Sequence, residues 1–562
     1  MRKAVLLVLT IILLATTFLV SCGEPETALP ARTPTPTTPA SETPTPTTAA
    51  EPLPAMMREM SLVVEALEVP GQKPGGKAGG RLHLVGPMNI ANIGDPSQNS
   101  NPTDATYTMV ACEPLLRYDA SGNLLPWLAR KYEIATDGSS ITFYLREGIK
   151  FQDDTPFNAE AVKYNIDIQI KTPVWPDMKP VESCEVIDEY TVKLNFKDGK
   201  LNWPTIKALA GAFSCLMYSP TYLAENSPEY KRTHVVGTGP FKLAEFKRDE
   251  YVKFDRFDGY WRGKPYLDGI DYKIIPDQNT QLMAFRSGEI DTLAVNPKDR
   301  EVLEADGFEV VQMPAIFVNP LALIPSSNYP DSPLADIRVR RACEHAIDKE
   351  GLLNTLGYGL GKVCNQLFIE EDPCYNPDVV GYPYDPAKAR QLLKEAGYED
   401  GLKLKFYQVD FLPMDFPLAI QDMWSEVGIE TEILRLSILQ INDMVSGPTA
   451  KGWEGWFYSY AMSGPGIDPA QALMYGPVSD NLFWISNWEP PELIALAKQG
   501  AAEVDVEKRI NIYQEISKKM VDDYAQWLFL YYALGLTSVS PRVHDTGYME
   551  GSQFAYAFAW VD

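Results

Sequence analysis

Histidine is scarce in this sequence, with only 4 among 562 residues. None of the four has a partner at the spacing that is typical of metal ligands. We therefore expect no metal site and no bound cofactor. The histidines are His83, His234, His345 and His544.

Positive charge is also in short supply. There are 50 Lys and Arg residues against 75 Asp and Glu residues, which gives a net charge of -25 and a pI near 4.7. Because nucleic-acid binding needs a basic surface, this balance excludes nucleic acid as the main partner. Hydrophobic residues make up 45% and aromatic residues 11% of the chain, as expected for a folded, soluble body.

Two common catalytic motifs are missing. The sequence contains neither the His-Glu-x-x-His pattern of zinc hydrolases nor the Gly-x-Ser-x-Gly pattern of serine hydrolases. A carboxylate pair for glycoside hydrolysis can always be picked from 75 acidic residues, but solvated surface charge explains them more simply. We expect that the protein is not an enzyme, and a secreted hydrolase is the alternative from another functional class.

The N-terminus carries an export signal. Met1-Arg2-Lys3 precedes an apolar run from Ala4 to Val20, which is short for a membrane span and typical of a secretory signal. The next residues, Ser21-Cys22, complete a segment that resembles a bacterial lipobox. We predict that residues 1–21 form a signal peptide and that Cys22 carries the lipid. Such an anchor would hold a soluble body on the extracytoplasmic side of the cell membrane, at the cell surface or in a periplasm.

A stalk is predicted over residues 22–79. Residues 23–55 contain nine prolines set among threonines. This composition favours extended polyproline II and cannot bury a hydrophobic core.

Six cysteines follow Cys22. An even number outside the cytosol permits up to three disulfides. Cys364 and Cys374 are close in sequence and form the first expected pair, and Cys184 with Cys215 is the second. For the other two cysteines, a buried free thiol is an equal alternative.

Strand and helix patterns alternate along the body. Runs of alternating β-forming residues predict strands at 141–145, 191–196 and 251–255. An Asp-Pro start and a terminating Gly predict a helix within 385–397. Helical spacing of apolar residues predicts another helix over 506–524. The pattern favours a mixed α/β class.

Several blocks, in a fixed order, carry a family resemblance. They resemble family 5 of the extracellular solute-binding proteins, the peptide-, nickel- and oligopeptide-binding components of ABC importers. The blocks are Ile93-Gly-Asp95-Pro96, Glu113-Pro-Leu-Leu-Arg117-Tyr-Asp, the stretch from Ser140 to Val162 with Asp153-Asp-Thr-Pro-Phe-Asn158, Gly237-Thr-Gly-Pro-Phe241, Tyr260-Trp-Arg-Gly-Lys-Pro-Tyr266, Phe285-Arg-Ser-Gly-Glu-Ile-Asp291 and Asp336-Ile-Arg-Val-Arg-Arg-Ala342.

The resemblance implies a fold of the periplasmic-binding-protein-like type II, with two lobes, a hinge and an extra domain. One ligand lobe would combine residues 80–111, 216–315 and 528–562. The extra domain would be 112–215 and the second ligand lobe 316–527. The two chain crossings between the lobes, near residues 315 and 527, would form the hinge, and the ligand would be enclosed between the lobes.

The resemblance also implies a monomeric receptor that passes a solute to ABC permease subunits, with peptides as the expected ligand. In peptide-binding relatives, the segment resembling Gly455-Trp456-Phe-Tyr-Ser459 forms an edge against an extended peptide. Those relatives usually carry an Asp three positions after the Trp, where it pairs with the peptide's α-ammonium. Ser459 stands there in this chain and cannot supply that charge-assisted bond. Asp468 is the nearest carboxylate that follows.

Aromatic residues are dense around this segment. Their flat faces suit sugar rings as well as peptide side chains, so an oligosaccharide receptor is the alternative, and a sensor-linked binding protein is a third possibility. Ordinary core packing is the competing explanation for each ring. The predicted ligand-binding residues are Trp456, Tyr458, Ser459, Tyr460, Asp468 and Trp484.

Overall fold

The computed structural model describes residues 63–65, 71, 74–86, 90–98, 102–119, 124–172, 176–210, 215–313, 318–410, 412–445, 450–461, 467–480, 483–547 and 556–562. The predicted signal peptide, Cys22 and most of the predicted stalk lie outside these residues. Within the described part, no helix combines the length and the apolar character that crossing a membrane requires.

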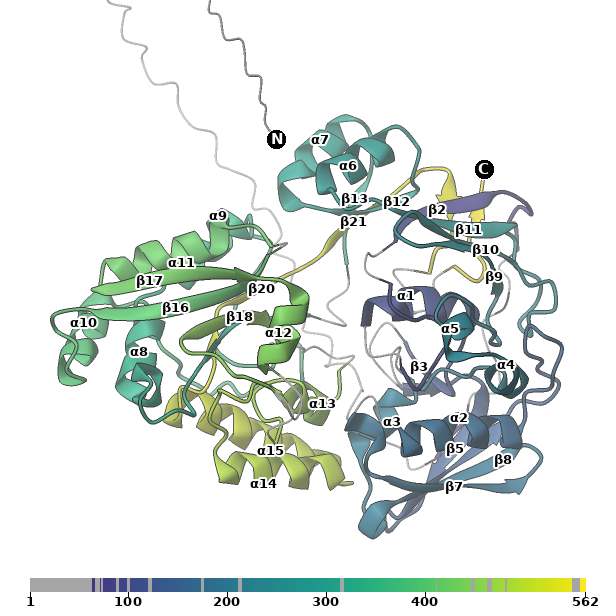
Figure 1. Ribbon diagram of the computed structural model, residues 1–562, viewed down its shortest axis with the longest axis horizontal. Helices are drawn as coiled ribbons and strands as arrows, with labels where there is room; N and C mark the ends of the chain where they lie inside the picture. The colour runs from purple at the N-terminus through teal and green to yellow at the C-terminus, as the bar shows by residue number, and fades with distance from the viewer. Residues whose placement is uncertain are drawn as a thin grey trace, which may run out of the picture. The chain divides into compact units, whose positions relative to one another are not determined.

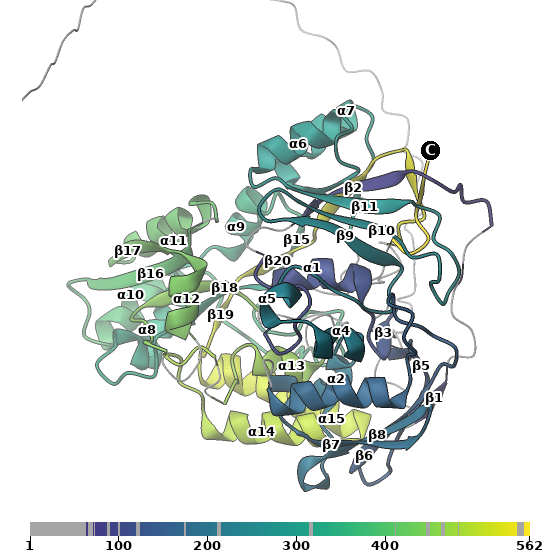
Figure 2. The same ribbon diagram turned by 45° about the vertical axis from the view of Figure 1, so that its right-hand side comes forward.

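A five-stranded antiparallel sheet in the order β1-β5-β6-β8-β7 forms the first layer, and helix α2 packs along β7 and β8 (Figures 1 and 2). Strand β1 lies within the predicted stalk but pairs with β5, so the folded body begins earlier than the composition suggested. The core beneath the sheet draws its residues from Leu115 to Met217. The elements are β1 Val63–Glu65, β3 Leu116–Tyr118, β4 Leu124–Pro126, β5 Ala129–Ile134, β6 Ser140–Leu145, α2 Ala159–Lys171, β7 Val181–Asp188, β8 Thr191–Phe196 and α3 Trp203–Ala208.

A second sheet has the order β2-β11-β10-β9, with β2 and β11 parallel and the other pairs antiparallel. Its alternate residues are buried, and its apolar face packs against residues of α1 and α4 in one core. The same core includes residues near the C-terminus, from β22 and β23. The elements are β2 Arg81–Gly86, α1 Pro102–Ala111, α4 Pro220–Glu225, α5 Pro228–Lys231, β9 Phe241–Lys247, β10 Tyr251–Arg256, β11 Gly269–Ile274, β22 Val543–His544 and β23 Trp560–Val561.

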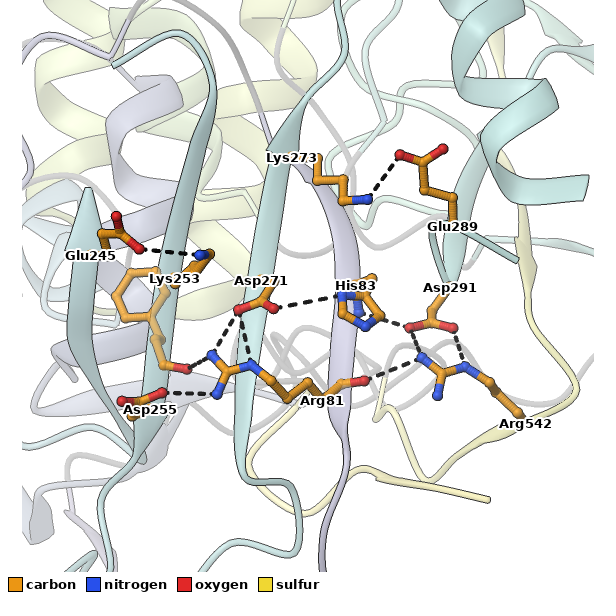
Figure 3. Close-up of polar contacts among 11 residues, drawn as sticks. Arg81, His83, Glu245, Lys253, Asp255, Asp271, Lys273, Glu289, Asp291 and Arg542 are labelled. Atoms are coloured by element: carbon orange, nitrogen blue, oxygen red, sulfur yellow. Dashed lines mark hydrogen bonds and ion pairs between the residues drawn. The ribbon is translucent and has the colours of Figure 1, made fainter. Parts of the chain in front are cut away.

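The opposite face of this sheet carries a row of ion pairs (Figure 3). Arg81 donates to Asp271 at 2.7 and 3.0 Å and to Asp255 at 2.8 Å. Beside it, the fully buried Asp291 accepts two bonds of 2.6 Å from Arg542 and one of 2.7 Å from the His83 main chain. These contacts tie β2 to the segment that ends at Asp291 and to the C-terminal segment that carries Arg542.

A small three-stranded sheet, β12-β21-β13, lies beside helices α6 and α7 (Figure 1). Its middle strand comes from the C-terminal part of the chain and pairs antiparallel with both neighbours. The elements are α6 Gln278–Arg286, β12 Thr292–Val295, α7 Arg300–Ala305, β13 Val310–Gln312 and β21 Leu536–Val539.

The largest α/β unit is built on a five-stranded sheet in the order β17-β16-β18-β14-β19. Strands β17, β16 and β18 are parallel, whereas β14 runs antiparallel to β18. Helices pack against both faces of this sheet, and each face forms its own hydrophobic core with them. The elements are β14 Leu321–Pro325, α8 Ile337–His345, α9 Lys349–Leu356, β15 Gly361–Val363, α10 Pro386–Glu395, β16 Leu402–Val409, α11 Asp415–Ser425, β17 Ile429–Leu436, α12 Ile438–Val445, β18 Trp456–Tyr460, α13 Pro469–Met474, α14 Pro491–Ala502, α15 Val506–Lys518, β19 Leu528–Phe529 and β20 Tyr531–Ala533.

The helix signals read from the sequence are confirmed. The Asp385 side chain caps α10 by accepting from the Lys388 N–H, and Gly397 follows the helix with φ of 90°, where glycine carries no Cβ strain. The helix predicted at 506–524 is α15, which ends in a short π-helical turn at Lys519–Asp523. The three predicted strands are β6, β8 and β10.

Helices α13 to α15 contact the segment that carries α3. The Trp203 indole donates to the Glu503 carbonyl at 2.9 Å, and the guanidinium of Arg509 lies over the Trp203 ring at 5.5 Å. The Tyr475 hydroxyl donates to Asp177 at 2.6 Å. These interactions connect residues far apart in the sequence.

The predicted disulfides are wrong. All six cysteines that follow Cys22 are buried, and Cys184, Cys364 and Cys374 are free thiols, so neither expected pair, Cys364–Cys374 or Cys184–Cys215, forms a disulfide. Cys215 contacts the sulfur of Met178 at 3.4 Å instead of a second cysteine. Burial raises the pKa of the Cys364 thiol to about 12, and that of Cys184 also to about 12. The thiols therefore act as small apolar side chains of the cores.

Candidate functional site

A cavity of about 790 Å³ opens where the small sheet approaches the large α/β unit. Its walls come from the turn after β12, the segments at 313 and 533–535, and the carboxyl ends of β16 and β18. Ligands of open α/β sheets bind at the carboxyl ends of parallel strands. The cavity has that position, and its volume is in the range of small-molecule and peptide sites.

Strand β18 supplies two predicted residues to this cavity. Tyr458 and Tyr460 both line it. Because side chains alternate along a strand, Ser459 points to the other face of the sheet and does not line the cavity. The serine hydroxyl donates to the Tyr460 carbonyl at 3.5 Å.

Among the described residues, no strand pairs with the last residues of β18 on the side of β16. Its partner β16 accompanies it only as far as the pairs Phe406–Trp456 and Tyr407–Phe457. On the other side, the Ala461 N–H donates to the Pro320 carbonyl at 2.8 Å, so Tyr460 belongs to a non-hydrogen-bonded pair with β14. The main-chain groups of Tyr460 therefore point away from β14, toward the side on which no described strand follows.

Aromatic rings form much of the cavity wall. The Phe416 and Tyr458 rings stack with centroids 4.4 Å apart, and Tyr460 lies 5.7 Å from Tyr458. Tyr460 is 47% exposed and Tyr358, on the same cavity, is 52% exposed. Burial raises the pKa of Tyr531 to about 12, so its hydroxyl stays protonated at neutral pH. The wall offers flat apolar faces with polar tips.

Two side chains of opposite charge line the same cavity. Lys298 stands in the turn after β12, and Asp415 is the first residue of α11. Both are exposed. They are the one cationic and the one acidic residue among the described residues that line this cavity.

Of three other predicted ligand residues, two are buried in the protein core and one, Trp484, is half-buried against it. Trp456 is 1% exposed and packs against Trp424 at 5.8 Å. Trp484 packs against Phe457 at 5.5 Å. None of the three residues lines the cavity. Trp456 shares a face of β18 with Tyr458 and Tyr460, but it stands at the first position of the strand, inside the core on that face, and Trp484 packs against the core on the other face. The third is Asp468.

Asp468 forms a buried ion pair. The Arg509 guanidinium donates to both of its oxygens at 2.8 Å, and the Ala470 N–H donates to one of them at 2.9 Å. Both side chains of the pair are at most 1% exposed. Burial alone would lower the pKa of Arg509, but the Asp468 charge raises it above its ordinary value. The Asp468 carboxylate caps α13 and binds Arg509, so it does not take the place of the aspartate that peptide-binding relatives usually carry where this chain has Ser459.

Five further residues that line the cavity were not predicted from the sequence: Lys298, Tyr358, Asp415, Phe416 and Tyr531. For Asp415 and Phe416, the sequence does contain a feature that indicates their position. The run that became β16 reads as a strand, and the loop after such a strand opens onto the ligand side of a parallel sheet. Asp415 and Phe416 follow that loop.

Metal binding has no support in the described part of the chain. No group of three or more His, Cys, Asp or Glu side chains in the described residues is arranged to hold a metal ion.

Comparisons with known proteins identify the family of this chain. Residues 123–472 match the model of bacterial extracellular solute-binding proteins, family 5 Middle. The chain is 27% identical to heme-binding protein A of Haemophilus influenzae over 472 residues, covering 78% of this chain and 83% of that protein. It is 27% identical to the dipeptide-binding protein of Escherichia coli over 436 residues, covering 71% and 79%.

Among solved structures, the chain is similar to the periplasmic binding protein DppA of Helicobacter pylori in complex with the peptide STSA. The TM-score is 0.75 at 20% identity, with 86% of this chain and 98% of that chain covered. The expected fold class, a type II periplasmic binding protein, is confirmed. The chain therefore belongs to family 5 of the bacterial extracellular solute-binding proteins, which serve ABC importers as receptors.

Proposed function

We propose that this protein is a lipid-anchored peptide receptor of an ABC importer, which captures its ligand in the cavity beside β18. The observation that carries the proposal is the open main-chain edge at Tyr460, next to stacked aromatic rings. An extended peptide that adds to a strand edge forms main-chain hydrogen bonds whatever its sequence, while the rings receive its side chains. Relatives described as binding a dipeptide or in complex with a peptide support this ligand class.

The domain organisation that we propose is the one expected from the family. Residues 80–111, 216–315 and 528–562 form one ligand lobe, 112–215 the extra domain and 316–527 the second lobe. The separate buried cores support this division except at one boundary, because β19 and β20 pack in the two cores of the large α/β unit and so extend the second lobe past residue 527. The Met313 N–H donates to the Gly535 carbonyl at 2.8 Å, so the two chain crossings lie together at the cavity and suit a hinge.

An oligosaccharide receptor is the second candidate. The exposed ring faces of Tyr358 and Tyr460 favour it, because sugar rings stack on such faces. Isothermal titration against a panel of free peptides and a panel of oligosaccharides separates the two. We expect heat of binding with peptides and none with sugars. Sugar binding without peptide binding would replace the proposal, and turnover of any panel member would contradict a purely receptive role.

Lipid anchoring at Cys22 is tested in cells. We expect Cys22→Ala to move the protein from the membrane fraction to the soluble fraction, because the acyl chains that hold it are then never attached. Globomycin treatment of the unchanged protein should block its processing. Membrane attachment that survives the substitution would contradict the anchor. The proposal further includes a monomeric body on the extracytoplasmic side that hands its ligand to the permease subunits.

A further inference from the structure

The two charges in the cavity come from separate parts of the fold. Lys298 follows β12 of the small sheet, and Asp415 begins α11 of the large α/β unit. In the described part of the chain, neither side chain forms a hydrogen bond or a close ion pair, although the Lys298 charge, together with the stronger effect of hydrogen bonds from Thr280, helps to lower the pKa of Asp277. Elsewhere on the molecule, exposed charges are commonly paired, as in the row of Figure 3. The cavity therefore holds one ammonium and one carboxylate, each with its hydrogen-bonding capacity free.

The other carboxylates near β18 are committed. Asp468 is buried in its pair with Arg509, and Glu454 lies at the other end of β18, where it contacts Lys405 at 3.4 Å. Among the described residues that line the cavity, Asp415 is the one acidic side chain available to a cationic group of a ligand. Lys298 is the one cationic side chain available to an anionic group.

We infer that Asp415 and Lys298 are specificity-determining residues, which bind the α-ammonium and the α-carboxylate of a short peptide with both termini free. This assignment rests on the proposed function. Water leaves the cavity when the ligand enters, and charge-assisted hydrogen bonds gain strength in the drier surroundings. A zwitterion that spans the cavity also contacts both parts of the fold at once. Between its ends, the edge of β18 and the rings of Tyr458 and Tyr460 receive the main chain and an apolar side chain.

The test uses three peptide libraries, each an equimolar mixture of tripeptides: free, N-acetylated and C-amidated. With the unchanged protein, we expect N-acetylation and C-amidation each to weaken binding by about tenfold or more, since each removes one charge-assisted interaction. Asp415→Asn should bind the free and the N-acetylated libraries alike and still discriminate against amidation. Lys298→Gln should show the opposite pattern. This crossed pattern is a readout that a general loss of packing does not produce.

Asp422→Asn is the matched control, because Asp422 is exposed on the same helix α11 and does not line the cavity. It should discriminate as the unchanged protein does. If Asp415→Asn and Lys298→Gln both keep the unchanged protein's full discrimination, the assignment is overturned while peptide binding stands. If none of the three libraries binds the unchanged protein, the proposed function is overturned and the assignment with it.

Discussion

Replacing Arg509 by methionine should lower the free energy of unfolding by about 3–5 kcal/mol, the usual cost of breaking a buried ion pair. Asp468 is fully buried and receives two hydrogen bonds from this guanidinium. Without them its charge has no counterion in a medium where desolvation is expensive. The substitution also removes the contact with the Trp203 ring. Urea denaturation followed by circular dichroism measures the change.

Two further variants isolate the cause. Lys508→Met removes a neighbouring cation whose pair with Asp505 is exposed, and it should leave stability almost unchanged. The double variant Asp468→Asn with Arg509→Met should recover part of the loss, because asparagine is neutral and still caps α13. A single variant as stable as the unchanged protein would show that the ion pair does not support the fold.

The pair Trp456→Ala and Tyr460→Ala should separate folding from binding. Trp456 is buried against Trp424, so its removal leaves a cavity and should cost about 3–5 kcal/mol of stability. Tyr460 is half exposed at the mouth of the ligand cavity, so its removal should leave stability nearly unchanged and weaken binding of the free tripeptide library by about tenfold.

For both variants, thermal unfolding measures the change in stability and isothermal titration measures the affinity for the free tripeptide library. A stable Trp456→Ala protein that has lost binding would place the indole in the ligand site after all. A Tyr460→Ala protein with full affinity would remove that ring from the site.

Much of the fold could be predicted from the sequence because its signals are local. The cap Asp385, the terminating Gly397 and the alternation in β6 each act within a few residues, and the structure follows them. The family resemblance supplied the type II fold. The disulfides failed because closeness in sequence, as in Cys364 and Cys374, does not fix the distance and direction that a bridge needs.

The candidate site was predicted in part. Strand β18 was found, but the aromatic density around it could not tell rings in the core from rings on the cavity. Once the strand is known, its period of two assigns Tyr458 and Tyr460 to the cavity and Ser459 to the opposite face. Lys298 and Asp415 lie more than a hundred residues apart, and only the tertiary structure brings both to one cavity.

A crystal structure of the protein saturated with the free tripeptide library tests the central claim most directly. We predict continuous density in the cavity, extended along β18 beside Tyr460, with one end at Asp415 and the other at Lys298. An empty cavity together with peptide density on another surface would contradict the account.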